Sequence, residues 1–136
     1  MNLVDTQTEQ ALLLTLIDAS DYDLPAAQSA LDQASVAEQD FTSIVIQKVF
    51  RFVENGLRRG EPINVFAMDP ELRGEVVKMK GIAGLTGLPL HGVASKGRRL
   101  RDLTMRRMLL RQASVLKEWS TDEVLDPFEA LSKVQS

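Results

Sequence analysis

Apolar residues recur at three- and four-residue steps along nearly the whole chain, and no stretch alternates strictly as a half-buried strand does. This pattern predicts an all-α fold of about six or seven helices. The first helix is expected to begin near Thr6, because the spacing of Thr6 and Glu9 fits a capping box. Its buried stripe is expected to be Leu12, Leu13, Leu16 and Ile17.

Two further helices are predicted in the first half of the chain. Asp23 is expected to cap the second helix, with Pro25 just inside its start. The third helix should begin at Asp40 and end at Gly56 or Gly60. Apolar residues cover much of its circumference, so we expect it to be the central helix. The second helix should pack through a thin face of small residues, namely Ala27, Ala30, Leu31 and Ala34.

The second half of the chain centres on a long basic helix. A short helix is expected from Asp69 and Pro70, followed by a glycine-rich connector over 81–92. Ser95 is then expected to cap the long helix, which should run to about Trp119. Its apolar stripe is expected to consist of Leu100, Leu103, Met108, Leu110, Ala113 and Leu116.

A short terminal helix should complete a hairpin with the long basic helix. Asp126 and Pro127 have the residue types of a helix start, and Phe128, Leu131 and Val134 follow at helical spacing. We therefore expect one domain with two parts, a helical head over 1–94 and the hairpin over 95–136.

The net charge of −3 hides a strong segregation along the chain. Residues 1–47 carry eight acidic and no basic residues, whereas residues 48–117 carry fifteen basic and six acidic ones. The last nineteen residues are again acidic. Either the helices attract one another and the remaining charges face solvent, or a basic face binds an acidic partner or nucleic acid.

Composition excludes several kinds of chemistry. The chain has no cysteine, which removes disulfides, thiolate metal sites and cysteine nucleophiles, and its only histidine is His91. Asp21 and Asp23 are interpreted as a polar turn and a helix cap. The series Gly81, Gly84 and Gly87 lacks the lysine of a phosphate loop and is interpreted as close backbone packing. We expect no catalytic residues, no cofactor and no metal.

The sequence predicts no secretory signal and no membrane-spanning segment. The amino terminus lacks the basic start of a secretory signal, and the stretch ALLLTLI is far shorter than the ~20 residues that span a bilayer. A cytoplasmic protein is therefore expected.

Five segments, taken in order, resemble the N-terminal domain of the DnaB family of bacterial replicative helicases. These segments are TEQALLLTLI, DFTSIVIQKVFRFVENGLRRGEPIN, GIAGLTGL, RRLRDLTMRRMLLRQAS and TDEVLDPFEALSKV, and together they span most of residues 8–134. Asn64 departs from the family's usual aspartate, Pro127 falls within its last helix, and the glycine-rich segment lacks its usual tyrosine. No Walker motif follows, so the family's ATPase motor has no counterpart in these residues.

The resemblance implies the role of a helicase collar, which self-associates and receives primase or helicase loader. A long helix that extends beyond its head also needs a partner for its apolar stripe, and we expect a homodimer or a higher oligomer. The residues expected at the self-association or partner surface are Leu103, Met108, Leu110, Leu116, Phe128 and Leu131. The leading hypothesis is thus a non-enzymatic assembly module of DNA replication that binds replicative helicase, primase or loader.

Three alternatives remain open at this point. The chain could be a small nucleic-acid-binding protein that uses its basic helix, a phage or mobile-element modulator of the host helicase, or a structural adaptor. Against nucleic-acid binding, the whole chain is acidic and shows no helix-turn-helix or zinc-finger spacing. The candidate contacts to an acidic partner or to nucleic acid are Arg98, Arg99, Arg106, Arg107 and Arg111.

Overall fold

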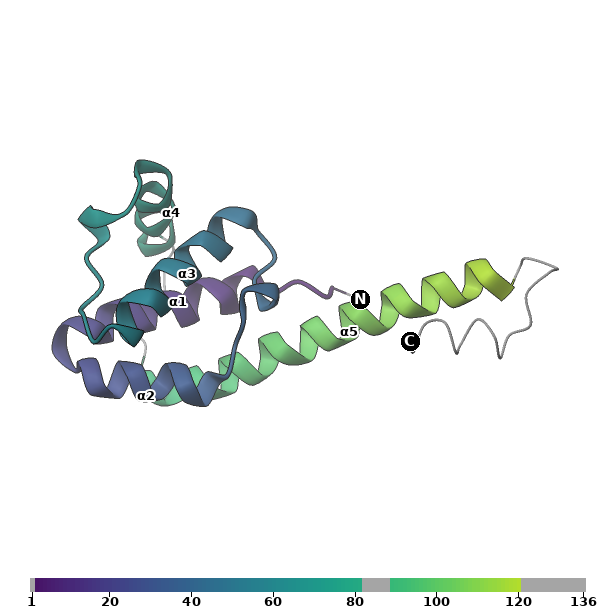
Figure 1. Ribbon diagram of the computed structural model, residues 1–136, viewed down its shortest axis with the longest axis horizontal. Coiled ribbons are helices and arrows are strands. Elements are labelled where there is room, and N and C mark those ends of the chain that lie inside the picture. Colours follow the sequence, from purple (N-terminus) through teal and green to yellow (C-terminus); the bar gives the residue numbers. More distant parts are fainter. Residues whose placement is uncertain (1, 82–88, 121–136) are drawn as a thin grey trace.

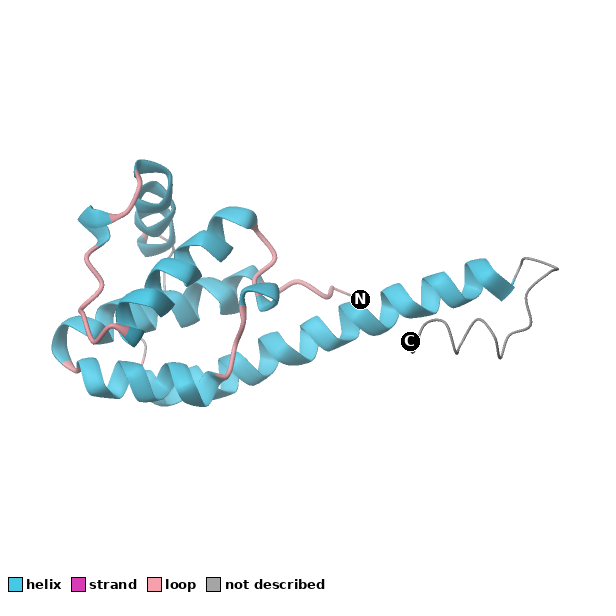
Figure 2. Ribbon diagram, viewed as in Figure 1, coloured by secondary structure: helices cyan, strands magenta, loops and turns pink. Residues whose placement is uncertain are grey.

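The computed structural model describes residues 2–81 and 89–120, and within these ranges the chain is helical with no strand (Figures 1 and 2). The all-α fold is therefore confirmed. The α-helices are α1 (Thr6–Tyr22), α2 (Leu24–Ala34), α3 (Ile44–Arg58), α4 (Pro70–Lys80) and α5 (Val93–Ser120). Three short 3₁₀ helices lie between them, namely η1 (Glu38–Asp40), η2 (Val65–Ala67) and η3 (Leu90–Gly92). The terminal helix expected from Asp126 lies outside the described residues.

The central helix is α1, which contacts α2, α3, α4 and α5. Leu12, Leu13 and Leu14 are buried at successive positions, so side chains on all sides of this helix are enclosed. The expectation that the third helix is central is wrong. Helix α3 leaves Ile44 and Lys48 exposed, because only one side of it faces the core.

The first helix begins at Thr6, as expected, whereas the third begins at Ile44, later than expected, and neither has the expected capping residue. Asp5, rather than Thr6, caps α1 and accepts hydrogen bonds from the Thr8 amide (3.1 Å) and hydroxyl (2.7 Å). Glu9 makes no capping box and is buried. Likewise Ser43, not Asp40, is the N-cap residue of α3, and Asp40 is buried in η1.

Other local predictions are confirmed. Asp23 caps α2 and accepts a hydrogen bond from the Ala26 amide at 3.2 Å. Helix α4 begins at Pro70, directly after Asp69. Gly60, with φ of +73°, follows the end of α3 and adopts the left-handed conformation that glycine tolerates best.

Helices α2 and α5 pack closely because both present small residues at their crossing. Ala27, Ala30, Leu31 and Ala34 of α2 are all buried, as predicted. Gly97 of α5 lies directly on Ala34, where an added Cβ would be 2.6 Å from the Ala34 carbonyl oxygen. This approach fixes the first part of α5 to the head.

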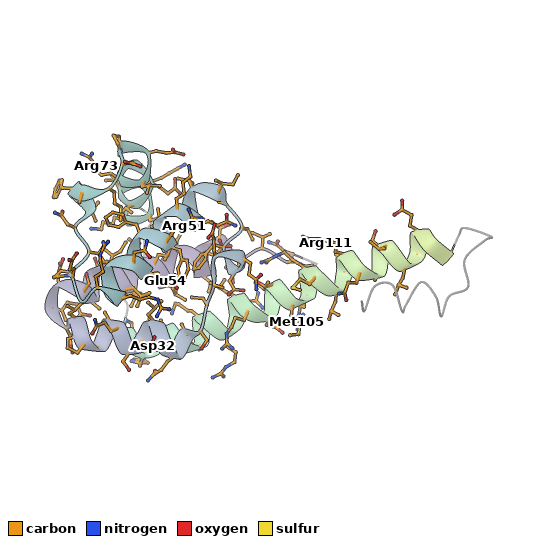
Figure 3. The ribbon with its side chains drawn as sticks, in the orientation of Figure 1. Asp32, Arg51, Glu54, Arg73, Met105 and Arg111 are labelled. Carbon is orange, nitrogen blue, oxygen red and sulfur yellow. The ribbon has the colours of Figure 1, made fainter. Side chains whose placement is uncertain are left out.

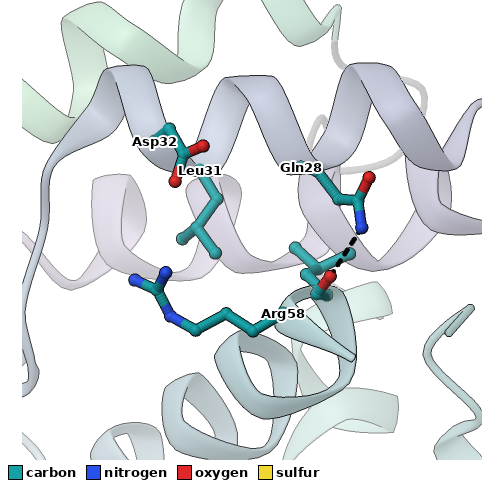
Figure 4. Close-up of a pocket in the computed structure, with 5 residues that line it drawn as sticks. Gln28, Leu31, Asp32 and Arg58 are labelled. Carbon is teal, nitrogen blue, oxygen red and sulfur yellow. Dashed lines mark hydrogen bonds between the residues drawn. The ribbon is translucent and has the colours of Figure 1, made fainter. Parts of the chain in front are cut away.

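A hydrogen bond joins α2 to the end of α3 beside a shallow surface pocket of about 350 Å³ (Figure 4). The Gln28 side-chain amide donates to the Leu57 carbonyl at 2.8 Å. Asp32 and Arg58 line the same pocket from opposite helices. Arg58 pairs instead with Glu54 of its own helix, at 3.4 Å.

The head takes in the beginning of α5. This helix starts at Val93, so the expectation that Ser95 caps it is wrong, and the buried residues among the described part of it end at Thr104. Its 28 residues correspond to about 42 Å at 1.5 Å per residue. The rest of α5 therefore extends away from the other helices (Figure 1).

Candidate partner-binding surface

The part of α5 beyond the head carries exposed apolar side chains. We call residues 105–118 the arm. Met105 is 62% exposed and Leu109 is 57% exposed, and Met108 and Leu110 are also exposed. Figure 3 shows Met105 and Arg111 on this projecting section. Because soluble monomers seldom expose several large apolar residues together, the arm is a candidate interface.

A groove of about 450 Å³ lies where the arm leaves the head. One wall is the segment between α2 and the end of η1, and the other is α5. We call it the arm groove. Its lining residues are Ser35, Ala37, Gln39 and Asp40 on the first wall and Arg101, Thr104, Met105, Met108, Leu109 and Gln112 on the second.

The exposed apolar residues of the arm fall on two sides of the helix. Successive residues are rotated by about 100° in an α-helix. Met108 and Leu110 are therefore about 200° apart. Leu110 is not part of the arm groove, so one flat interface cannot contain both side chains.

A buried polar cluster, which we call the clasp, holds α5 to η1 at the base of the arm. The Thr104 hydroxyl lies 2.5 Å from Asp40 Oδ1 and 3.0 Å from the Leu100 carbonyl oxygen, and its single proton can serve one of them. Asp40 Oδ2 accepts a hydrogen bond from the Ala37 amide at 2.8 Å. The carboxylate thus connects α5 to the chain before η1.

Arg107 extends the clasp to the amino-terminal segment. Its guanidinium donates to the Leu3 carbonyl at 2.7 Å, to the Gln39 carbonyl at 3.3 Å and to the Thr104 hydroxyl oxygen at 2.9 Å. These three acceptors come from three different parts of the chain. Arg107 therefore joins α5 to the amino-terminal segment and to η1.

Two carboxylates of the first helix region have shifted pKa values near this cluster. Burial raises the pKa of Glu9, although hydrogen bonds from the Thr42 amide (2.8 Å) and hydroxyl (2.9 Å) and the charge of Arg107 oppose the shift. For Asp5, burial is outweighed by hydrogen bonds from Thr8 and by Arg99, which together lower its pKa. Glu9 is thus an acid held inside the head by hydrogen bonds to the segment that precedes α3.

The raised pKa of Glu9 predicts a pH dependence of stability. A carboxyl group with a higher pKa in the folded state binds protons more tightly there, so its contribution is fully present below the unfolded value, near 4.5, and is lost as pH rises through the folded pKa. We expect wild type to gain stability relative to Glu9→Gln as pH falls from neutral towards 4.5. Urea unfolding of both proteins at several pH values measures this difference. A constant difference across that range would contradict the prediction.

Three of the five expected partner-binding arginines are engaged within the chain. Arg99 pairs with Asp5 at 3.3 Å, Arg106 pairs with Asp102 at 3.0 Å, and Arg107 belongs to the clasp. Arg98 and Arg111 are exposed and form no ion pair within the described ranges. Attraction between the acidic first part of the chain and the basic helix therefore accounts for part of the charge segregation.

The residues expected at a self-association surface are only partly available for one. Leu103 is 2% exposed and is buried within the chain itself. Met108 and Leu110 are exposed on different sides, and Leu116 is half-buried. Phe128 and Leu131 lie outside the described residues.

Two large apolar residues of the arm groove, Met105 and Leu109, were not expected at a partner surface. Met105 and Leu109 have the i, i+4 spacing that places side chains on one face of a helix. Together with Met108 and Leu116 they form a second apolar stripe, distinct from the stripe of Leu100 and Leu103 that faces the head. The spacing of this second stripe in the sequence could have identified Met105 and Leu109 as surface residues of the arm.

The other chemical candidates are not brought into a common site. Asp23 caps α2, Asp21 is exposed, and His91 is exposed in η3. Gly81 follows α4, whereas Gly84 and Gly87 lie outside the described residues. Among the described residues, no group of three or more histidine or acidic side chains could hold a metal ion.

Comparisons with protein-family models, curated proteins and solved structures found no match to the chain.

Within the described part of the chain, none of the helices combines the length and apolar character required to cross a bilayer.

Proposed function

We propose that the chain is a non-enzymatic assembly module that self-associates through the arm groove, and that it acts in DNA replication as the collar of a replicative helicase does. The apolar stripe of the arm, formed by the exposed Met105, Met108 and Leu109 and the half-buried Leu116, is the observation that supports self-association. The order of motifs that resembles the DnaB-family N-terminal domain is the reason to propose a role in replication. That resemblance makes replicative helicase, primase and helicase loader the partners to test.

The stripe is self-complementary for two antiparallel copies. Around a two-fold axis between Met108 and Leu109, each of these residues faces the other in the second copy. The same axis pairs Met105 with Gln112 and Arg101 with Leu116, and all but Leu116 of these residues line the arm groove. The outer turns of one arm would fill the groove of its twin, as an isologous interface requires.

Leu109→Glu is expected to dissociate this dimer. The axis places both copies of residue 109 close together, so the substitution buries two like charges and should weaken association by roughly a hundredfold or more. Leu110→Glu is the matched control, because it adds the same charge at an exposed neighbour outside the groove. Sedimentation velocity at about 50 μM measures the oligomeric state of each protein. At this concentration a dimer with a dissociation constant of about 1 μM is nearly fully formed.

Three outcomes of that experiment are informative. A dimeric wild type and Leu110→Glu with a monomeric Leu109→Glu support the proposed interface. A monomeric wild type contradicts self-association, and equal dissociation by both variants contradicts the position of the interface. Pull-down of helicase, primase and loader by the wild-type protein then tests the replication role separately, and capture of none of them by an intact dimer would remove that role.

The arrangement of the arginines favours this function over nucleic-acid binding. Arg99, Arg106 and Arg107 already have partners inside the chain. Releasing them for phosphate contacts would break the clasp and two ion pairs.

A further inference from the structure

A second groove lies on α4, which contacts α1 and α3 and is across the head from α5 (Figure 1). We call it the α4 groove, and its volume is about 400 Å³. Three parts of the chain form it: the end of α1, the segment 62–66 and one side of α4. Figure 3 shows Arg73 on the head beside α4, away from Arg111 on the projecting section of α5.

Large apolar side chains line the α4 groove and remain exposed. Phe66 of η2 is 82% exposed, and Val77 of α4 is 62% exposed. An aromatic side chain that is so open beside a groove provides the apolar anchor typical of a peptide-binding surface.

The charges of the α4 groove are divided between its walls. Arg73 and Lys80 line it from α4, and Asp18 and Asp21 line it from α1. No ion pair joins these walls among the described residues. The groove is therefore bipolar: it has a cationic wall and an anionic wall, and neither forms an ion pair among the described residues.

Arg73 has an unused hydrogen-bond donor. Its Nε is buried and has no hydrogen-bond partner among the described residues. Its Nη2 reaches only the Met68 carbonyl, at 3.5 Å. A buried donor without a partner costs free energy, so Arg73 is incompletely satisfied within the chain. Arg73 also lines the groove, and a carboxylate is the acceptor that best matches a guanidinium.

We propose that the α4 groove binds a peptide segment of a partner protein in which an apolar side chain lies between a carboxylate and a basic side chain. The carboxylate lies against Arg73 and Lys80, and the apolar side chain packs on Phe66. The basic side chain faces Asp18 and Asp21. The groove is separate from the arm, so this site does not depend on the self-association proposed above.

The acidic wall distinguishes such a peptide from a nucleotide. The four charged side chains of the groove sum to zero, so a phosphate at Arg73 would leave the groove with a net negative charge beside the two carboxylates. A peptide with one acidic and one basic side chain adds no net charge and satisfies both walls. The two aspartates thus select a bipolar ligand over a polyanion.

An NMR titration of the full chain with acetyl-Glu-Leu-Phe-Lys-amide tests this site. We expect saturable shifts centred on the amides of Phe66, Val77 and Lys80 at peptide concentrations up to about 5 mM, the range for a short ligand with millimolar affinity. The neutral peptide acetyl-Gln-Leu-Phe-Gln-amide and the acidic peptide acetyl-Glu-Leu-Phe-Glu-amide should bind roughly tenfold more weakly.

Substitutions on α4 provide a matched control. Lys80→Gln and Arg73→Lys should each weaken binding of the bipolar peptide several-fold, because the first removes a charge and the second removes the fork of donors. Lys78→Gln changes the same charge on a side of α4 that does not line the groove and should leave binding unchanged. Absence of saturable shifts at the groove would overturn the proposal. Equal binding of the neutral peptide, or tighter binding of AMP than of the bipolar peptide, would do the same.

Discussion

Replacing Gly97 with alanine is expected to lower the free energy of unfolding by about 2–4 kcal/mol, since it overpacks a close helix crossing. The added Cβ would lie 2.6 Å from the Ala34 carbonyl oxygen and 2.8 Å from both the Cα and the Cβ of Ala34. Most of these atoms belong to backbone, which cannot rotate away. Helices α2 and α5 would have to separate, and contacts along both would be lost.

Gly74→Ala is the control, because the same substitution at this position should change the free energy of unfolding in the opposite direction. Gly74 also lies inside a helix, but an added Cβ there meets nothing within 4 Å. Alanine at such a position should stabilise the protein by about 0.5–1 kcal/mol, because it restricts the unfolded chain and favours the helix. Urea unfolding of the two variants should therefore move in opposite directions. A stability of Gly97→Ala at or above that of wild type would show that the crossing is not tightly packed.

The close packing was only half predictable from the sequence. The small residues of α2 indicated a thin packing face, and the structure buries all four of them. The matching residue, Gly97, carried a weaker signal. A glycine inside a helix costs stability relative to alanine and so implies a packing reason, but the sequence does not say which helix supplies it.

Local capping rules failed where an acidic residue had a tertiary role. Glu9 has the spacing of a capping box with Thr6, yet it lies in the interior and binds Thr42, 33 positions away. Asp40 has the residue type of an N-cap, yet it binds Thr104 of α5. Spacing along the chain records only neighbours in sequence, so it cannot reveal hydrogen bonds between distant segments.

The candidate interface was predictable as a helix but not as a surface. The periodicity of apolar residues correctly placed a long basic helix near the end of the chain. It merged two stripes, however, because Leu103 faces the head while Met108 faces the arm groove. Which stripe of α5 the head covers depends on where the other helices pack, and the spacing of apolar residues within α5 does not contain this information.

Removing the Asp40 carboxylate is expected to be the second large effect on stability. Asp40→Ala should lower the free energy of unfolding by about 2–3 kcal/mol, because it leaves the Ala37 amide without its acceptor in a partly buried position. Thr104 can still donate to the Leu100 carbonyl at 3.0 Å, so the loss falls mainly on the chain before η1. Hydrogen exchange at the Ala37 amide should accordingly become faster.

Asp40→Asn separates the hydrogen-bonding role of Asp40 from its charge. The asparagine oxygen can accept from the Ala37 amide, and its amide group can donate to the Thr104 hydroxyl oxygen, which then donates to Leu100. This variant should retain most of the stability and lose about 1 kcal/mol or less, since each partner remains bonded. If Asp40→Asn is as unstable as Asp40→Ala, the stabilisation by Asp40 requires its negative charge. If neither variant loses stability, the Asp40 carboxylate does not stabilise the segment before η1. Urea unfolding monitored by circular dichroism distinguishes these three results. A double-mutant cycle of Asp40→Ala and Thr104→Val measures how strongly the two side chains are coupled.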